Sequence, residues 1–453
     1  MNVSSNIRSM NRPQIRERRF GMIRFNAKTV AHYLVLYVML LIPGSCAVAK
    51  YLNANMVFVA VLALHVFLIL LSPKFRGVYV LFIELLLLVT IMFVRARTGG
   101  AGITSWLRFA AILSITYIAI RMDKQMFFTR FIRIVAIFAI ISNVFWAIFC
   151  VSPSLVNAWP AITFWTQDMG TGKWAVSLHG KGLWLYSYLE VHPTRNCGFY
   201  TEPGVYQIVL NAALIVLLFW RDKLRDITSR QYYLYLTIVI ITILTCQSTT
   251  GYISMAIILT LYLVKVQHGR ESSKIRLGLV IGVAVAIIAA IVDYSWRGTE
   301  SVLYQQVIYK FFGDSGETSL NLSEGTGRAR IGTIEVSLQA ILQDPLGVGT
   351  DQFEIMKNTH DRALVAGSFF SFAAQYGVIP WAILLGLLLY PLATRGTFMF
   401  TALTALVFVN TTSAQSFILF PGLIIFSIYL ASENKLNSNT LYDETKDITN
   451  EKM

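Results

Sequence analysis

The sequence predicts an all-α, polytopic integral membrane protein with about 12 transmembrane helices. Of its 453 residues, 55% are hydrophobic and only 14% are charged. Soluble domains have about 25% charged residues, so this balance is typical of a chain solvated by lipid. Apolar runs of roughly 20 residues, the length that crosses a bilayer as a helix, recur along the chain. Two long polar stretches interrupt these runs.

The apolar runs fall into three groups. The first group gives spans at about 29–49, 56–72, 77–94, 105–120 and 131–151. The second gives 202–220, 232–248, 251–266 and 275–292, and the third gives 367–393, 397–411 and 414–431. The connecting loops at about 152–201 and 293–366 are long, and we expect them to contain short helices. Residues 29–432 are therefore predicted to form a single transmembrane domain.

Lysine and arginine flanking the spans set the orientation, because they collect in short cytoplasmic loops. They cluster in a basic N-terminal tail, 1–28, and in alternate loops thereafter. Both the N-terminal tail and the polar C-terminal tail, 433–453, are thus predicted to be cytoplasmic, with both long loops facing outward. Arg95, Arg97 and Arg108 are exceptions around an outer loop. The net charge of +14 then reflects topology and attraction to anionic lipid, and it requires no nucleic acid partner.

Common catalytic motifs are missing from the sequence. The nearest phrase to a phosphate-binding loop, Gly170-Thr-Gly-Lys173, lacks the first glycine. HExxH, GxSxG and a run of acidic metal ligands do not occur either. A reaction catalysed by this chain would therefore use an activated substrate, without a metal or a cofactor. Ionisable residues inside the spans are scarce, and His32, His65 and Glu84 are the clearest.

The segment from Arg195 to Gly204 places two charges at the mouth of a predicted span. Pro203 suits the first turn of a helix, so Thr201 or Glu202 is a candidate helix cap. Arg195 either reaches lipid headgroups or binds the pyrophosphate of a lipid. A guanidinium offers a planar fork of donors to phosphate oxygens and keeps its charge at low dielectric, which favours the second role.

Aromatic residues in the first long loop are candidates for glycan contact. Trp174, Trp184 and Tyr186 carry flat faces with a polar edge, which suit sugar rings. The same residues suit a belt at the membrane interface or the packing of the loop itself. Both alternatives stay open at this point.

The second long loop carries a basic pair and a histidine. Arg328 and Arg330 precede a predicted amphipathic helix, 331–343, which ends at Asp344-Pro345 and is expected to lie on the outer surface. His360 follows, and its ordinary pKa near neutrality makes it a candidate general base. A lone loop histidine is more often structural or solvated.

The motifs of the two long loops, in their order along the chain, resemble those of the O-antigen polymerase and O-antigen ligase superfamily. The resemblance rests on Arg195-x-x-Gly198-x-x-x-Glu202-Pro203-Gly204, on Arg328 and Arg330, and on Asp344-Pro345-Leu-Gly347-Val-Gly349. It implies a GT-C-like fold in the bacterial inner membrane. It also implies transfer of a glycan from undecaprenyl pyrophosphate to an acceptor hydroxyl at the periplasmic face.

The resemblance also assigns roles to residues. It implies that Arg195 and Arg330, with Arg328 as a second choice, hold the donor pyrophosphate. His360 corresponds to the histidine near the acceptor in ligases, but the residues after it depart from that pattern. The Glu202-Pro-Gly setting is more similar to polymerases, where Glu202 would orient or activate the acceptor.

A repeat-unit polymerase of O-antigen or capsular polysaccharide is accordingly the favoured function, with a lipid-linked repeat unit as acceptor and a chain-length regulator as an expected partner. A ligase that transfers glycan to lipid A-core is the nearest alternative. A polysaccharide flippase is the alternative from another class, and arginines deep in a midplane cavity would favour it.

Overall fold

The computed structural model describes residues 26–43, 46, 53–100, 102–158, 162–169, 176–182, 185–190, 193–265, 325–360, 367–416 and 418–433, with short pieces between 277 and 304. Most of these residues are helical. In the described part, five helices are long and apolar enough to cross a membrane. They are α2 (Ala54–Leu71), α3 (Val78–Thr98), α4 (Ile103–Met122), α5 (Phe127–Val151) and α15 (Val378–Arg395). The prediction of a helical protein suited to a membrane is confirmed at this level.

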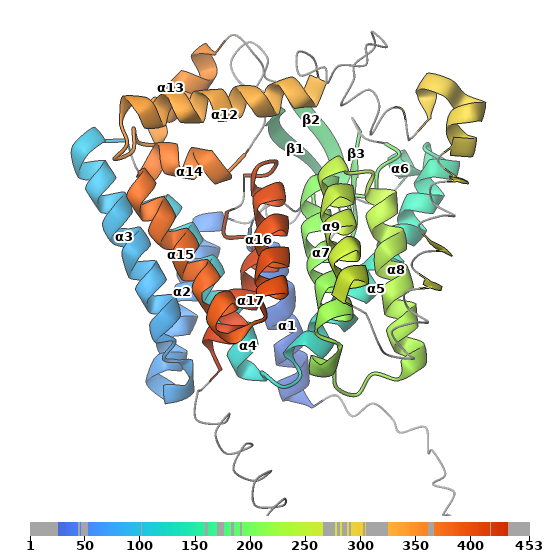
Figure 1. Ribbon diagram of the computed structural model, residues 1–453, viewed down its shortest axis with the longest axis horizontal. Coiled ribbons are helices and arrows are strands. Elements are labelled where there is room, and N and C mark those ends of the chain that lie inside the picture. Colours follow the sequence, from blue (N-terminus) through green and yellow to red (C-terminus); the bar gives the residue numbers. More distant parts are fainter. Residues whose placement is uncertain are drawn as a thin grey trace, which may run out of the picture.

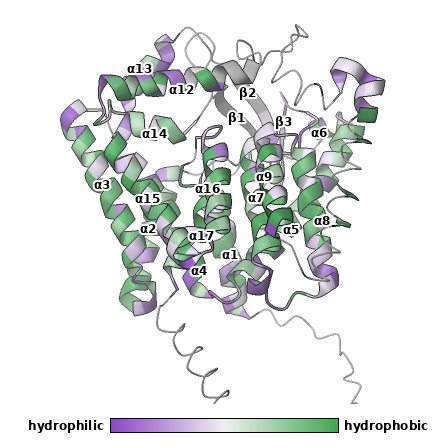
Figure 2. Ribbon diagram, viewed as in Figure 1, coloured by the Kyte–Doolittle hydropathy of each residue, from purple (hydrophilic) through white to green (hydrophobic). Residues whose placement is uncertain are grey.

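Shorter apolar helices complete the bundle. They are α1 (Ala27–Leu41), α7 (Pro203–Phe219), α9 (Thr249–Lys265), α16 (Phe398–Thr412) and α17 (Pro421–Ala431), and α8 (Ser229–Cys246) packs beside α7. Figure 1 shows these helices running between two ends of the molecule. We call the end that carries α12 the upper end, and the end near residues 26 and 433 the lower end. Hydrophobic residues cover the helices between the ends, as Figure 2 shows.

Helix α7 lies at the centre of the bundle. Every residue from Pro203 to Phe219 is buried, and the helix packs against α5, α8, α9 and α17. By contrast, α2 and α3 expose many large apolar side chains, among them Leu70 and Val78, as expected of helices that face lipid. Helix α7 begins with Pro203-Gly204, so its position places the Glu202-Pro-Gly motif at the edge of the protein interior.

Three predicted spans have the wrong limits, and proline or glycine explains each error. Helix α1 ends at Leu41, two residues before Pro43-Gly44, and not at 49. The span predicted at 367–393 is divided into α14 (Phe369–Tyr376) and α15, because Gly377 between them has φ +98°. Helix α17 begins at Pro421 and not at 414, so a loop precedes it. The span predicted at 275–292 lies largely outside the described residues.

The first long loop corrects the all-α prediction. It contains the single-turn helix α6 (Leu155–Ala158) and then a three-stranded antiparallel sheet in the order β1-β2-β3. The strands are β1 (Ile162–Met169), β2 (Val176–Gly182) and β3 (Ser187–Leu189). Ile162 pairs with Gly182, and Gly182 pairs with Ser187. The loop thus contains one short helix, as expected, but the backbone polar groups of its described strands are satisfied by strand pairing, which was not expected.

The second long loop contains helices, as predicted. Helix α12 (Gly325–Gln343) ends directly before Asp344-Pro345, and α13 (Thr350–Thr359) follows. Helix α12 begins at Gly325, before the predicted start at 331, so Arg328 and Arg330 lie within α12. Figure 1 shows α12 lying across the upper end of the bundle, with α13 above α14 and α3.

Ionisable side chains within the bundle have polar partners. Ser114 Oγ donates a hydrogen bond to Glu84 Oε1 (2.7 Å) and lies 2.7 Å from His65 Nδ1. His32 contacts Arg130, which also forms an ion pair with Asp123 (3.0 Å). An unpaired charge in lipid is costly, and these contacts lower that cost.

Two of the three arginines expected around the outer loop, Arg97 and Arg108, also have structural partners. Arg97, at the upper end of α3, forms an ion pair with Asp344 and donates a hydrogen bond to the Gly347 carbonyl. Arg108 donates to the Pro43 carbonyl (3.1 Å). The Pro-Leu-Gly-Val-Gly turn is fixed further by Val348 N, which donates to the Ala374 carbonyl (2.9 Å). Arg97 thus attaches the second long loop to the bundle.

The turn generates a stability prediction. Gly347 has φ +98°, and a Cβ atom there would lie 2.7 Å from the Gln375 carbonyl oxygen. We expect Gly347→Ala to lower the free energy of unfolding by roughly 1–3 kcal/mol. Thermal unfolding of the detergent-solubilised protein would measure this loss.

Gly386→Ala is the matched control for this substitution. Gly386 lies within α15, and a Cβ atom there would meet no other atom within 4 Å. Alanine favours a helix over glycine by about 1 kcal/mol, so Gly386→Ala should be neutral or stabilising. Equal melting temperatures for the two variants would contradict the role assigned to the Gly347 turn.

Candidate functional site

Glu202 marks the candidate site at the upper end of α7. It occupies the N-cap position, but its side chain makes no capping hydrogen bond. The prediction that Thr201 or Glu202 caps this helix is therefore confirmed for Glu202 as the N-cap residue, although no side-chain capping hydrogen bond forms. Instead, Gln415 Nε2 donates to Glu202 Oε1 (3.5 Å) from the loop that precedes α17. The helix still favours an anion at this position through its dipole.

Arg195 is fixed by bonds to the residues on either side of it. The Thr194 carbonyl accepts hydrogen bonds from Trp146 Nε1 (2.8 Å) and Gln247 Nε2 (3.2 Å). Asn196 is completely buried, and its backbone N donates to the Thr245 carbonyl (2.9 Å). These contacts come from α5 and α8, so the backbone at Arg195 is held against the bundle.

The Asn196 side chain and Gly198 fix the conformation of the backbone that follows Arg195. Asn196 Nδ2 donates to Ser142 Oγ (3.2 Å) and Thr245 Oγ1 (3.1 Å), and its Oδ1 accepts from Gly198 N (3.0 Å). Gly198 has φ +58°, and a Cβ atom there would lie 2.5 Å from the Tyr206 ring. Only glycine permits both this conformation and this contact, which gives a physical reason for the glycine of the motif.

Arg330 reaches the same place from α12. Its Nη2 donates a hydrogen bond to Thr250 Oγ1 (3.1 Å) at the start of α9. Arg330 and Arg195 both interact electrostatically with Glu202. We call these three residues the arginine–glutamate cluster. It joins the two long loops, from positions that are 135 residues apart in the sequence (330 minus 195).

Burial perturbs the acidity of the whole cluster. It raises the pKa of Glu202 above its ordinary value, while the Gln415 hydrogen bond, Arg330 and Arg195 act in the opposite direction. Burial also lowers the pKa of both guanidinium groups, and Glu202 opposes that change. Two cations with one carboxylate leave a local excess of positive charge. This arrangement suits an anionic ligand in a partly desolvated site.

A cavity of about 270 Å³ lies at the same end of the molecule, between α4, α12, α13 and α14. Charged side chains line it at Arg108, Glu354 and Lys357, together with several hydroxyl groups. Ser368, another lining residue, donates through its Oγ to the Gln415 carbonyl (2.8 Å). Gln415 therefore connects the wall of this cavity to Glu202.

The remaining predicted residues differ in placement. His360 follows the last residue of α13, which Figure 1 shows above α3 and α14, across the bundle from α7 and α9. Arg328 lies in α12, but its side chain is outside the described residues. Trp174 and Trp184 are also outside them. Tyr186 is only 4% exposed and packs against Phe145 and Phe149, so its ring is a packing element and offers no free face to a glycan.

Sequence analysis missed Asn196, Thr250 and Gln415. Asn196 lies within the motif, but only its charged neighbour Arg195 was assigned a role from the sequence. Thr250 belongs to the polar run Gln247-Ser-Thr-Thr250 between two spans, which was a usable signal. Gln415 was assigned to a span, although it lies in a loop. Among the described residues, no group of three or more His, Cys, Asp or Glu side chains could hold a metal ion.

The comparisons with known proteins identify no relative. The chain matches no family model, no curated protein and no solved structure. Its function must therefore be argued from the arginine–glutamate cluster and the surrounding fold.

The raised pKa of Glu202 generates a prediction about pH. The folded protein holds this proton more tightly than the unfolded chain, so the carboxyl group favours folding most below its ordinary pKa. That contribution is lost as the pH rises through the raised pKa. We expect the melting temperature of Glu202→Gln, relative to the wild type, to increase between about pH 4 and pH 8.

Glu354→Gln is the control, because it removes a carboxylate from the same end of the molecule, where Glu354 pairs with Lys357 (2.9 Å). It measures the general effect of losing one negative charge. If the melting temperature of Glu202→Gln relative to the wild type instead decreases as the pH rises, the two arginines lower the pKa of Glu202 more than desolvation raises it.

Proposed function

We propose that this protein is a repeat-unit polymerase of O-antigen or capsular polysaccharide. It would transfer a glycan from undecaprenyl pyrophosphate to a hydroxyl group of a lipid-linked repeat unit. The observation that carries the proposal is the arginine–glutamate cluster, in which Arg195 and Arg330 come from separate loops to one carboxylate at the mouth of α7. Guanidinium pairs of this kind suit the recognition of pyrophosphate.

The proposed chemistry uses the three residues in different roles. The acceptor oxygen attacks the anomeric carbon of the donor sugar, and the bond from that carbon to the pyrophosphate oxygen breaks. Arg195 and Arg330 offset the negative charge that develops on the departing undecaprenyl pyrophosphate. Glu202 accepts the proton of the acceptor hydroxyl, and its raised pKa makes its carboxylate a stronger base than an exposed glutamate.

The cavity between α4, α12, α13 and α14 supports this assignment. Hydroxyl and charged side chains in it match the hydrogen-bonding groups of a sugar, so we place the acceptor glycan there. Ser368 in the cavity wall contacts Gln415, which contacts Glu202, and we propose that the acceptor hydroxyl reaches the base along this connection. No metal and no cofactor take part in this proposal.

The membrane orientation belongs to the same proposal. Lys74, Arg76 and Arg121 lie at the lower end of the bundle, beside the last described residues of the chain. Because cations flanking spans gather on the cytoplasmic side, we place the lower end in the cytoplasm. The cluster then faces the periplasm at the bacterial inner membrane, where a lipid-linked donor is available. A chain-length regulator would act as a partner on this side.

Two alternative functions make less use of these features. A ligase would employ His360 near the acceptor. His360 follows α13, which supplies Glu354 and Lys357 to the cavity, but the arginine–glutamate cluster that carries the proposal does not include it. A flippase would place its arginines in a midplane cavity, whereas Arg195 lies in the loop before α7 and Arg330 lies in α12 across the upper end.

Deletion of the gene separates these functions in the bacterium that encodes it. If the protein is the polymerase, deletion leaves products with a single repeat unit on lipopolysaccharide or capsule gels. Core without any O-antigen would identify a ligase. Repeat units trapped on the cytoplasmic side would identify a flippase. A gel ladder of polysaccharide chains with normal lengths after deletion would contradict the polymerase proposal.

The roles of the arginines can be tested separately. We expect Arg195→Ala and Arg330→Ala to reduce chain extension by a factor of about 100 or more, because each removes charge stabilisation from the leaving group. Lysine at either position should restore little activity, because it lacks the planar fork of donors. Gel ladders from complemented deletion cells would measure chain extension.

Arg297→Ala is the control for these substitutions. Arg297 is exposed in the second long loop and pairs only weakly with Asp293 (3.7 Å), so its loss should leave the ladder unchanged. All variants are compared at equal membrane abundance. Full extension by Arg195→Ala or Arg330→Ala would refute the role of that arginine.

A further inference from the structure

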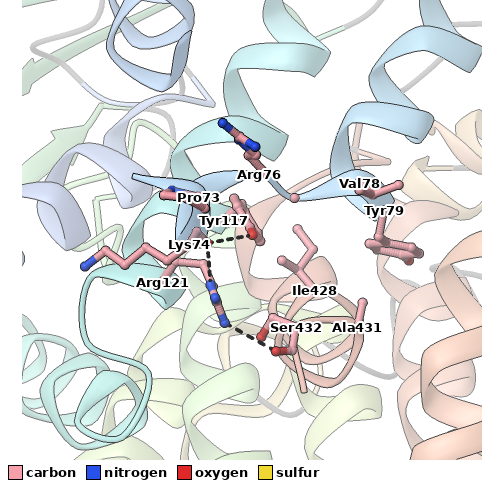
Figure 3. A pocket seen from close by; sticks show the side chains of 11 residues that line it. Pro73, Lys74, Arg76, Val78, Tyr79, Tyr117, Arg121, Ile428, Ala431 and Ser432 are labelled. Carbon is pink, nitrogen blue, oxygen red and sulfur yellow. Dashed lines mark hydrogen bonds between the residues drawn. The ribbon is translucent and has the colours of Figure 1, made fainter. Parts of the chain in front are cut away.

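A second cavity opens at the lower end of the bundle, remote from the arginine–glutamate cluster. Its volume is about 580 Å³, and it lies between the turn joining α2 to α3, the end of α4 and the end of α17. Figure 3 shows the residues that line it. Three of them are cations, Lys74, Arg76 and Arg121, and none of the lining residues is acidic. We call it the basic cavity.

The walls of the basic cavity are fixed by hydrogen bonds. Arg121 Nε donates to the Lys74 carbonyl (2.9 Å), and its Nη1 donates to the Ser432 carbonyl (3.4 Å). Tyr117 Oη also donates to the Lys74 carbonyl (3.3 Å). Gly77 packs so closely on the Tyr117 ring that a Cβ atom there would lie 2.6 Å from it. The turn is therefore held rigidly against α4 and α17.

The two cations of the turn keep their charges available. Lys74 and Arg76 are exposed, and Figure 3 shows their charged ends extending outward from the rim of the cavity, away from Ile428, Ala431 and Ser432. The Lys74 ammonium lies 4.8 Å from the centre of the Phe75 ring, and Arg76 forms no ion pair with any described residue. Gly77, the N-cap of α3, and Val78, its first residue, also line the cavity, so the positive end of the α3 dipole adds to the charge there. Together these groups attract a phosphate.

Apolar surface continues directly from the basic cavity. Val78, which lines the cavity, is 77% exposed, and exposed side chains follow on α3 at Phe82, Leu85 and Val89. Phosphate recognition beside an apolar stripe matches a phospholipid, whose headgroup and acyl chains occupy adjacent regions. A free phosphate ion would make no use of the stripe.

We propose that the basic cavity binds the phosphate headgroup of an anionic phospholipid, with the acyl chains lying along α3. This site is independent of the glycan reaction proposed above. The lipid would stabilise the contact between the α2–α3 turn, α4 and α17, because these three elements form the cavity walls.

The test is a titration of the purified full-length protein in detergent with phosphatidylglycerol, followed by native mass spectrometry and thermal unfolding. Phosphatidylcholine with the same acyl chains and free glycerol phosphate serve as comparison ligands. We expect phosphatidylglycerol to bind and raise the melting temperature, and the comparison ligands to do neither. Equal effects of phosphatidylcholine or of glycerol phosphate would overturn the proposal, by showing that charge or acyl chains are dispensable.

A pair of double variants locates the site. Lys74→Gln with Arg76→Gln removes two exposed cations from the cavity and should raise the dissociation constant for phosphatidylglycerol about 30-fold. Arg230→Gln with Lys265→Gln removes two exposed cations elsewhere on the molecule, and Lys265 lies 5.1 Å from the centre of the Phe219 ring, a contact like that of Lys74. This control should bind as the wild type does. Equal losses in both double variants, or no loss in the first, would refute the site.

Discussion

The carboxylate of Glu202 is the constraint on which the upper end of the molecule depends. It lies at the start of α7, a helix whose residues are all buried, and burial also removes water from the carboxylate itself. Desolvation of this kind would cost several kcal/mol without compensation. Gln415, Arg195 and Arg330 supply that compensation from three separate segments. A single buried charge therefore determines where both long loops and the loop before α17 must meet.

The same rule governs the interior of the bundle. Glu84 is bonded to Ser114, and Arg130 to Asp123 and His32, so each charge that the sequence places among apolar residues finds a polar partner. Arg97 extends the rule to the surface, since its contacts with Asp344 and Gly347 attach the second loop to α3. Two of the three exceptions to the distribution of charge around the spans, Arg97 and Arg108, are thus explained by individual contacts.

Sequence predicted the parts of the fold that depend on local chemistry. Most apolar runs became helices near the expected residues, and α12 ended at Asp344-Pro345 as anticipated. The errors in the predicted helices arose where contacts between residues distant in the sequence determine the secondary structure. Gly377 divides a predicted span because its turn packs against Leu346, and the sheet in the first loop depends on pairing between separate strands. Likewise, motif order identified Arg195, Glu202 and Arg330, but their common environment depends on Gln415 and Thr250, which have no sequence pattern of their own.

The two ends of the bundle present positive charge in different ways, and the difference has a physical consequence. At the upper end, Arg195 and Arg330 are partly buried beside a carboxylate, where electrostatic interactions are strong and orientation is fixed. At the lower end, Lys74 and Arg76 are exposed, so water and salt weaken their interactions with any single anion. The first arrangement suits the stabilisation of charge that develops on a leaving group. The second suits reversible association with a lipid, because it binds without requiring the ligand to give up its hydration. In the proposals made above, one chain would recognise phosphate at both ends and would confine group transfer to the end where the charges are desolvated.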